Sequence, residues 1–124
     1  TDMKKQVLWL DDMRCPTEFG WDKYINFYCR DEYDVTWVKS YDEFVDFIST
    51  NEMPHYIFFD HDLGMNKSGM DCMKYLINHI QDNNINPHSV IVRSQSSNPV
   101  GRENMLCLFD CYVKCWCYEE KASI

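Results

Sequence analysis

Short apolar runs alternate along this chain with segments whose apolar residues recur every three or four positions. Four of these runs have the length and content of β-strands, and they span residues 6–10, 35–38, 56–59 and 90–92. The first and third runs are almost continuously apolar and are each followed directly by an aspartate. This pattern is typical of strands that are buried on both faces of a parallel sheet.

The segments between the runs carry helical periodicity, over residues 21–28, 41–48, 73–80 and 105–116. Ser40 and Glu43 form the pattern of a capping box, which predicts the start of the second helix. The third helix is predicted to start near Ser68. The last segment also has the Val, Trp and Tyr content of a fifth strand over residues 112–118, but its unbroken helical period favours a helix.

Alternation of strands and helices predicts right-handed crossovers and a parallel sheet with helices on both faces. We therefore expect an α/β fold, a three-layer doubly wound parallel sheet of four strands in the order 2-1-3-4. The chain has no internal repeat and no linker rich in Gly, Pro or Ser. One domain is predicted over residues 4–119, with tails at 1–3 and 120–124.

Acidic residues follow two strands that are neighbours in this order. Asp11 and Asp12 follow the first strand, and Asp60 and Asp62 follow the third. Ligands of open α/β sheets bind beyond the carboxyl ends of the strands, at the point where the strand order reverses. Several carboxylates held together need a cation, and hard oxygen ligands suit Mg²⁺ or Mn²⁺. The alternative is that these acids are ordinary solvated loop residues.

A histidine, His61, lies between the two acids that follow the third strand. It is a candidate general acid or base, or a metal ligand, because imidazole changes its charge near neutral pH. A surface histidine without a catalytic role is the alternative. Gly64, shortly after it, suits a turn with positive φ.

The segment after the fourth strand has the composition of a phosphate cradle. Ser94 and Asn98 offer polar groups just before a predicted helix start, where backbone amides favour anions. Asn98 as N-cap with Pro99 in the first turn is a purely structural interpretation, and it is compatible with phosphate binding. Arg14 and Arg93 are cations near the same edge, and arginine holds phosphate oxygens in pairs.

The composition and net charge of the chain exclude several classes of binding partner. The 124 residues carry 12 basic and 20 acidic side chains, for a net charge of −8. Such a charge disfavours long nucleic acids and anionic membrane surfaces. No apolar run is long enough to span a bilayer, and the start of the chain lacks the pattern of a secretion signal. Seven cysteines without regular spacing indicate reduced thiols, and so a cytoplasmic protein.

Four of the cysteines lie in the last predicted helix. Cys107, Cys111 and Cys115 fall at i, i+4 and i+8, on one helix face, as soft metal ligands would. Without a paired CxxC motif, packing in the core or at an interface is the favoured interpretation. The helix is apolar almost all round, which predicts that a second subunit covers it in a homodimer.

Taken together, these motifs resemble the receiver domain of two-component response regulators. The paired acids after the first strand, the aspartate after the third and the hydroxyl after the fourth occupy the positions of that family's phosphorylation site. The chain is more similar still to the cyclic-phosphate processing receivers, a receiver-like family. This similarity rests on residues 10–16, 59–64 and 98–105.

The resemblance implies a metal-dependent site that binds or hydrolyses a phosphoester, such as a cyclic nucleotide phosphate. Asp11, Asp12 and Asp60 would hold Mg²⁺ or Mn²⁺, and Asp60, His61 and Asp62 would be the catalytic residues. The phosphate would be contacted by Arg14, Arg93, Ser94 and Asn98. The family's His-Ser pair before Asn-Pro is replaced here by Arg93 and a longer serine-rich stretch, which leaves open which serine fills the hydroxyl role.

Three functions therefore stay open. The first is a phosphoesterase that acts on a cyclic phosphate. The second is a signalling receiver in which Asp60 accepts a phosphoryl group, although the lysine that ends the fifth strand of ordinary receivers has no clear counterpart and Lys114 lies in the last predicted helix. The third is a non-catalytic module that binds a nucleotide or a protein.

Overall fold

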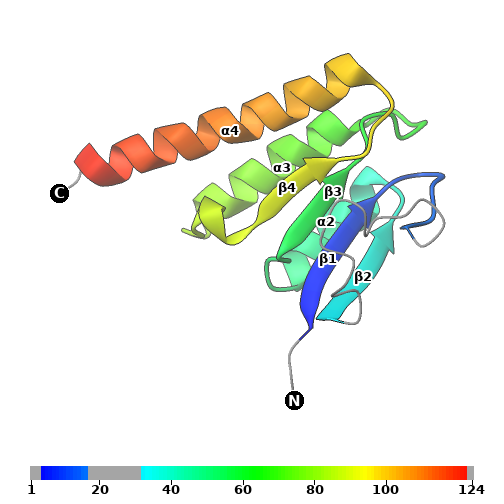
Figure 1. The fold of residues 1–124 in the computed structure, drawn as a ribbon, viewed down its shortest axis with the longest axis horizontal. Coiled ribbons are helices and arrows are strands. Elements are labelled where there is room, and N and C mark those ends of the chain that lie inside the picture. Colours follow the sequence, from blue (N-terminus) through cyan, green and yellow to red (C-terminus); the bar gives the residue numbers. More distant parts are fainter. Residues whose placement is uncertain (1–3, 17–31, 123–124) are drawn as a thin grey trace.

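The computed structural model describes residues 4–16 and 32–122. Within these residues, four parallel strands form one sheet in the order β2-β1-β3-β4 (Figure 1). The strands are β1 (Lys5–Leu10), β2 (Tyr33–Val38), β3 (Tyr56–Phe59) and β4 (Ile91–Ser94). All four point toward the same edge of the sheet, as their arrowheads show in Figure 1. The predicted strand order is confirmed.

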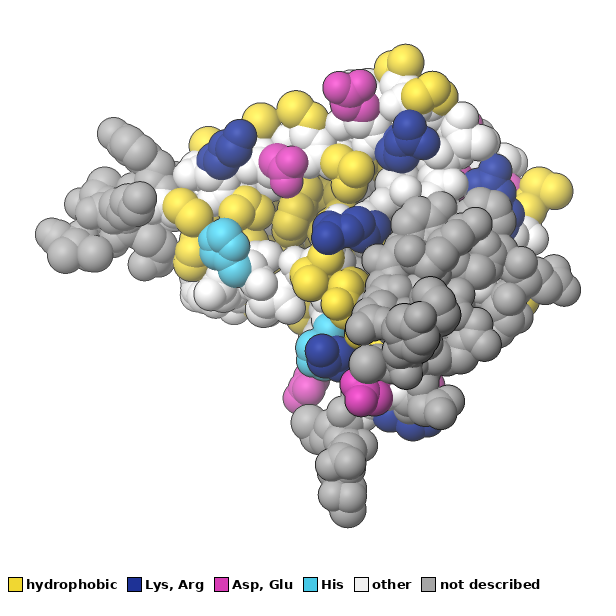
Figure 2. All heavy atoms as spheres, viewed as in Figure 1, with side chains coloured by type: hydrophobic (Ala, Val, Ile, Leu, Met, Phe, Trp, Pro, Cys, Tyr) yellow, Lys and Arg dark blue, Asp and Glu magenta, His cyan; other side chains and the backbone are white. Residues whose placement is uncertain are grey.

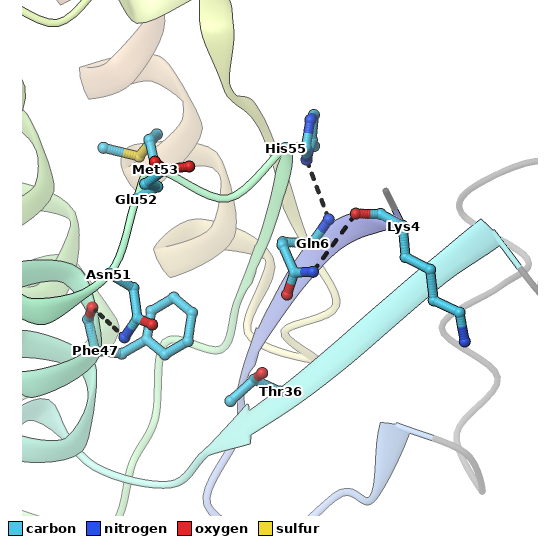
Figure 3. A pocket seen from close by; sticks show the side chains of 8 residues that line it. All are labelled: Lys4, Gln6, Thr36, Phe47, Asn51, Glu52, Met53 and His55. Atoms are coloured by element: carbon cyan, nitrogen blue, oxygen red, sulfur yellow. Dashed lines mark hydrogen bonds between the residues drawn. The ribbon is translucent and has the colours of Figure 1, made fainter. Parts of the chain in front are cut away.

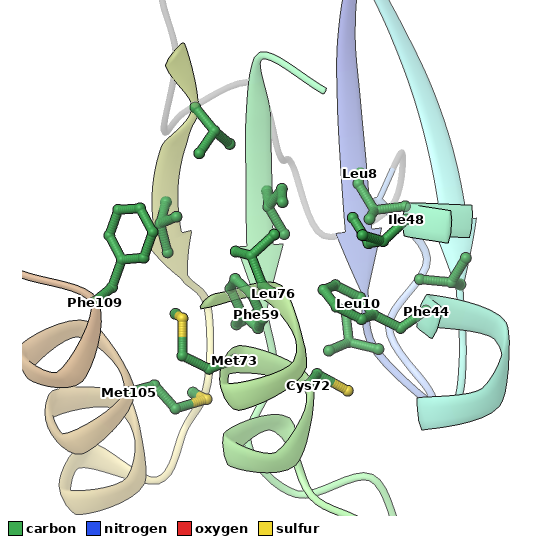
Figure 4. Packing of buried hydrophobic residues seen from close by; sticks show 14 of the residues in the cluster. Leu8, Leu10, Phe44, Ile48, Phe59, Cys72, Met73, Leu76, Met105 and Phe109 are labelled. Carbon is green, nitrogen blue, oxygen red and sulfur yellow. The ribbon is translucent and has the colours of Figure 1, made fainter. Parts of the chain in front are cut away.

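The helices in the described part of the chain pack against one face of this sheet. They are α2 (Tyr41–Thr50), α3 (Gly69–Asp82) and α4 (Pro99–Ala122), with a short 3₁₀ helix, η3 (Pro87–Ser89), before β4. Buried residues from all three α-helices and the sheet form one hydrophobic cluster (Figure 4). The helix predicted over residues 21–28 lies outside the described residues.

Strand β1 is buried on both faces, as its apolar run predicts. Leu8 and Leu10 belong to the cluster under the helices, whereas Val7 and Trp9 point the other way and pack with Phe58. These four side chains of β1 are at most 1% exposed. Because alternate residues of a strand face opposite sides, this pattern needs cover on both faces of the sheet.

The helix starts follow local capping. The Oγ of Ser40 accepts from the amide of Glu43 at 3.1 Å, while the Glu43 carboxylate accepts from the amide of Lys39 rather than of Ser40. Ser68 forms a complete capping box with Asp71. Both helices therefore begin where the sequence predicts.

The C-terminal segment, for which a helix and a fifth strand were both considered, forms the long helix α4. Residues 112–118 are helical, so the helix prediction is confirmed and the alternative fifth strand is wrong. Met105 and Phe109 are buried in the main cluster. Cys107, Cys111 and Cys115 are exposed, so they do not pack in the core of this chain. None of the described helices is long and apolar enough to cross a membrane.

Candidate functional site

The carboxyl ends of the strands meet at one edge because the backbone pairing continues past each strand. The amide of Asp11 donates to the carbonyl of Val38 at 3.0 Å, and the amide of Asp60 donates to the carbonyl of Leu10 at 3.0 Å. The amide of Gln95 donates in the same way to Phe59 at 3.3 Å. The first residues after β1, β3 and β4 are therefore fixed side by side. α4 begins at the same edge (Figure 1).

Three carboxylates converge at this edge. One oxygen of each of Asp11, Asp12 and Asp60 lies within 4.8 Å of the others. The side chains of Asp11 and Asp60 are only 1% and 7% exposed, and Asp12 is half-buried. The acids that the sequence assigns to two separate strand ends are thus brought together as one group, which we call the acid trio.

The carboxylate of Asp11 is held from three directions. Its Oδ1 accepts from the amides of Met13 at 3.0 Å and Arg14 at 2.8 Å. Its Oδ2 accepts from Nε2 of Gln95 at 3.3 Å. Hydrogen bonds of this kind fix the position of a carboxylate.

Two tryptophans hold the loop after β1 in place. The indole nitrogen of Trp37 donates to the carbonyl of Asp11 at 2.7 Å, and that of Trp9 donates to the carbonyl of Arg14 at 2.9 Å. Both rings belong to the smaller apolar cluster on the far face of the sheet. The packing of that face therefore helps to orient the acid trio.

The environment of Asp60 disfavours its negative charge. Burial raises the pKa of Asp60 from 3.8 to about 6, and the negative charges of Asp11 and Asp12 add to the rise. Arg14 and the backbone amide of His61 offset only part of this effect. Such a group gains most from a nearby cation, because a positive charge removes the repulsion that raises its pKa.

This shift predicts how the metal-free protein responds to pH. Between about pH 4 and pH 6 the folded state keeps a proton on Asp60 that the unfolded state has lost, so stability falls as pH rises through this window. Asp60→Asn should therefore be more stable than the wild type at pH 7, by at most about 3 kcal/mol, and equally stable near pH 3.5. Urea unfolding with a chelator present measures the difference.

The control for this prediction is Asp82→Asn, at the exposed end of α3. It should leave the stability difference between the two pH values unchanged. If Asp60→Asn were no more stable than the wild type at pH 7, the unfavourable charge at Asp60 would be contradicted.

Next to the acid trio, His61 forms a pair with Asp62. Its Nδ1 lies 2.8 Å from Oδ1 of Asp62, and this contact lowers the pKa of Asp62. An ionised carboxylate can only accept, so Nδ1 carries the proton of this bond and Nε2 of the neutral ring is a base. Nδ2 of Asn98 lies 3.5 Å from both Nδ1 of His61 and Oδ2 of Asp62.

Asn98 links this pair to α4. Its Oδ1 accepts from the amide of Gly101 at 3.0 Å and its carbonyl accepts from the amide of Arg102 at 2.9 Å, so Asn98 is the N-cap of α4. The N-cap interpretation is confirmed. The same side chain faces the His61–Asp62 pair with its other end, which places the start of α4 against the candidate base.

Gly101 is required by the close approach of His61. A Cβ at this position would lie 2.6 Å from Cδ2 and 2.8 Å from Nδ1 of His61. We expect Gly101→Ala to displace the imidazole ring, break its contact with Asp62 and cost about 1–3 kcal/mol of stability. Changed imidazole NMR signals and a lowered unfolding midpoint would show this. Val100→Ala, at a neighbouring side chain that is 68% exposed, should change neither.

The other predicted phosphate ligands, Arg14, Ser94 and Arg93, each donate a hydrogen bond to a backbone carbonyl. Nη1 of Arg14 donates to the carbonyl of Gln95 at 3.0 Å, and Arg14 is close enough to lower the pKa of Asp60. The hydroxyl of Ser94 donates to the carbonyl of Phe59 at 2.7 Å, so its proton is used within the backbone. Arg93 lies inside β4, and its guanidinium donates to the carbonyl of Val92.

Gln95 is a residue of this edge that the sequence analysis missed. Its side chain is buried, and its Nε2 donates to the carbonyl of Leu10 at 2.9 Å as well as to Asp11. Its Oε1 is buried without a hydrogen-bond partner. A polar residue directly after a strand, at the same edge as Asp11 and Asp60, was the signal that could have identified it.

A separate hollow lies near the opposite edge of the sheet (Figure 3). It lies by the amino-terminal ends of β1 and β3, where the amide of Gln6 donates to Nδ1 of His55 at 3.0 Å. Its lining has a single acid, Glu52, and so lacks the convergent carboxylates of the acid trio. Among the described residues, the convergent carboxylates lie at the carboxyl edge and not in this hollow.

The strand order and the acids at the ends of β1 and β3 define a receiver-like α/β domain. The chain belongs to the Cyclic-phosphate processing Receiver domain family, whose model matches residues 6–110. The comparison with curated proteins gives no match.

Solved structures give weaker likenesses. A fusion that carries the trimeric coiled coil of yeast Spc42 is 19% identical with a TM-score of 0.49, and the match covers 77% of this chain and 54% of that one. This chain therefore spans about half the length of the fusion. The N-terminal domain of a response regulator/sensory box/GGDEF 3-domain protein from Carboxydothermus hydrogenoformans is 14% identical with a TM-score of 0.48, and the match covers 95% and 99% of the two chains.

Proposed function

We propose that this domain is a metal-dependent phosphoesterase that opens a cyclic phosphate ester. The observation that carries the proposal is the acid trio, three convergent carboxylates of which two are buried, beside a histidine that is paired with its own aspartate. Membership of a family described as processing cyclic phosphates supports the same substrate class.

The residues present fit a hard divalent cation. Burial and the charges of Asp11 and Asp12 raise the pKa of Asp60, and Arg14 offsets only part of this rise. The acid trio would therefore be stabilised by a further positive charge. The buried Oε1 of Gln95 is a further oxygen without a partner. Asp11, Asp12 and Asp60 would hold Mg²⁺ or Mn²⁺, which prefer oxygen ligands. When bound, such an ion neutralises charge on the phosphate and polarises its oxygens.

The residues of the chain supply the proton transfer. Hydrolysis forms a bond from a water oxygen to phosphorus, breaks one ring bond between phosphorus and oxygen, and returns a proton to the departing oxygen. Asp62 accepts a hydrogen bond from Nδ1–H of His61, which leaves Nε2 to take the proton of the attacking water. Asn98 keeps the pair at the start of α4.

Arg14 and the start of α4 are the proposed phosphate contacts. Arg14 lies at the edge of the acid trio, and helix N-termini favour anions. Asn98 is already ordered there as the N-cap. Ser94 and Arg93 make backbone contacts that compete with a role in phosphate binding, so we assign them secondary roles.

The proposal is tested by incubating the protein with 2′,3′-cyclic nucleotides and cyclic oligonucleotides in the presence of Mg²⁺ or Mn²⁺. We expect at least one linear phosphate product by chromatography, and none after addition of a chelator. If no member of the panel is opened under either metal, the phosphoesterase proposal is wrong. Shifts in the unfolding temperature with the same ligands, without any product, would instead favour a non-catalytic binding module.

The second candidate is a phosphoacceptor receiver in which Asp60 is phosphorylated. The position of Asp60 directly after β3, within an acid trio, favours it. The chain continues from β4 into α4, and Lys114 is an exposed residue of that helix, so the described residues provide no strand-borne lysine beside Asp60. An acyl-phosphate donor should give a labile, metal-dependent adduct that Asp60→Asn lacks if this candidate is correct.

The proposed partner is a small phosphoester rather than a polymer. The net charge of −8 opposes a long polyanion, whereas a divalent cation at the acid trio, together with Arg14, would offset the negative charge there. We also propose a reducing, cytoplasmic setting, which the exposed free thiols of α4 favour.

A further inference from the structure

The outer face of α4 carries a thiol pair that the proposed phosphoesterase site does not use. Cys107 and Cys111 lie four positions apart, about one helical turn, and both are exposed. They border a shallow hollow along the helix together with charged residues such as Glu103 and Asp110. In Figure 2, basic, acidic and apolar side chains are interspersed along α4.

The two thiols contact each other. The Cys107 thiol donates a hydrogen bond to Cys111, which raises the pKa of Cys107, and the negative charges of Asp110 and Glu103 add to the rise. The Cys107 thiol therefore holds its proton more firmly than an ordinary thiol does. Two sulfurs one turn apart form a preorganised chelate, because the helix backbone already holds them on one side.

The number of ligands selects the kind of ion. Among the described residues, the acid trio is the only group of three or more acidic, histidine or cysteine side chains that converge as metal ligands. The thiol pair thus offers two sulfurs without a third ligand. Structural Zn²⁺ takes four ligands, whereas Cu⁺ is a soft ion that two thiolates can satisfy in a nearly linear arrangement.

We propose that Cys107 and Cys111 form a two-sulfur binding site for a soft monovalent metal ion, with Cu⁺ as the ion of this class. Binding forms two bonds between sulfur and copper and releases one proton from each thiol to solvent, without oxidation of either partner. Affinity should therefore rise with pH across the neutral range.

This site is separate from the acid trio. Cys107 lies nine residues beyond the N-cap Asn98, which is about 13 Å along the helix axis. The ligand classes also differ, since hard carboxylate oxygens suit Mg²⁺ or Mn²⁺ and soft sulfurs suit Cu⁺. Loss of one site should leave the other intact, so the two proposals fail or succeed independently.

The test is a competition titration of the reduced 124-residue chain with Cu⁺ held by a chromogenic chelator. We expect one Cu⁺ per chain and a sulfur-to-copper charge-transfer band in the near ultraviolet. Cys107→Ser and Cys111→Ser should each weaken Cu⁺ binding by at least roughly 10- to 100-fold, which is the usual cost of losing a residue that only supports a metal ligand. Cys115→Ser, which changes the next exposed cysteine along the helix, should bind as the wild type does.

Three results would overturn this proposal. One is unchanged Cu⁺ affinity in both Cys107→Ser and Cys111→Ser. A second is loss of binding in Cys117→Ser alone, because Cys117 lies 3.1 Å from Nε2 of His88 and would then be the ligand. Zn²⁺ is the comparison ion, and tighter binding of Zn²⁺ than of Cu⁺ by the same pair would also contradict the two-ligand argument.

Discussion

Asp60→Asn should lower the hydrolysis of a cyclic phosphoester by about a hundredfold to a thousandfold. The variant keeps the size of the side chain but removes one of three convergent carboxylates. Charge stabilisation by a bound divalent ion contributes several kcal/mol to such a transition state, and each 1.4 kcal/mol is about tenfold in rate. Initial rates of product formation at saturating Mn²⁺ measure the loss.

Stability separates this effect from misfolding. Asparagine at position 60 removes an unfavourable buried charge, so the variant should be less active and yet more stable than the wild type at pH 7 in the absence of metal. The exposed Asp82→Asn variant should retain full activity. Wild-type rates in Asp60→Asn would remove Asp60 from the proposed mechanism.

His61→Gln should slow turnover by about 10²- to 10⁴-fold, the usual contribution of a positioned general acid or base. His61 supplies the imidazole of the described His61–Asp62–Asn98 cluster, and imidazole is the side chain best suited to general acid–base catalysis. Because His61 is not part of the acid trio, affinity for Mn²⁺ should stay within about twofold of the wild type, a change of less than 0.5 kcal/mol. Rates and metal affinities measured on one preparation distinguish a catalytic role from a ligand role.

The matched control is His79→Gln, on α3, where the imidazole stacks on Tyr75. It should leave turnover unchanged. Asp62→Asn should fall between the wild type and His61→Gln, since it removes the group that orients the ring but keeps the ring itself. A variant of His61 with wild-type rates would leave the domain without its proposed base.

The sequence predicts the framework of this fold well because the framework depends on local patterns. The buried positions of β1, which face both sides of the sheet, are all apolar. Ser40 and Ser68 mark the starts of α2 and α3. The parallel sheet follows from the alternation of strands and helices, and the expected order 2-1-3-4 is the one observed. Strand order and the acids after β1 and β3 are then sufficient to predict the acid trio.

The parts that the sequence did not predict depend on contacts between distant segments. Gln95 bonds to Leu10 and Asp11 across more than 80 residues, and no local pattern encodes that contact. The need for glycine at position 101 comes from a ring on another loop. The exposure of Cys107 and Cys111 was also missed, because a helix that is apolar almost all round does not show which side faces the sheet.

The central claim of this account is that the acid trio binds one divalent cation. Electron paramagnetic resonance of Mn²⁺ added to the metal-free protein tests it directly, because bound and free Mn²⁺ give distinct signals. We predict one Mn²⁺ per wild-type chain, displaced by Mg²⁺, and strongly weakened binding in Asp60→Asn. Equal binding by the wild type and Asp60→Asn, or no binding by either, would contradict the claim.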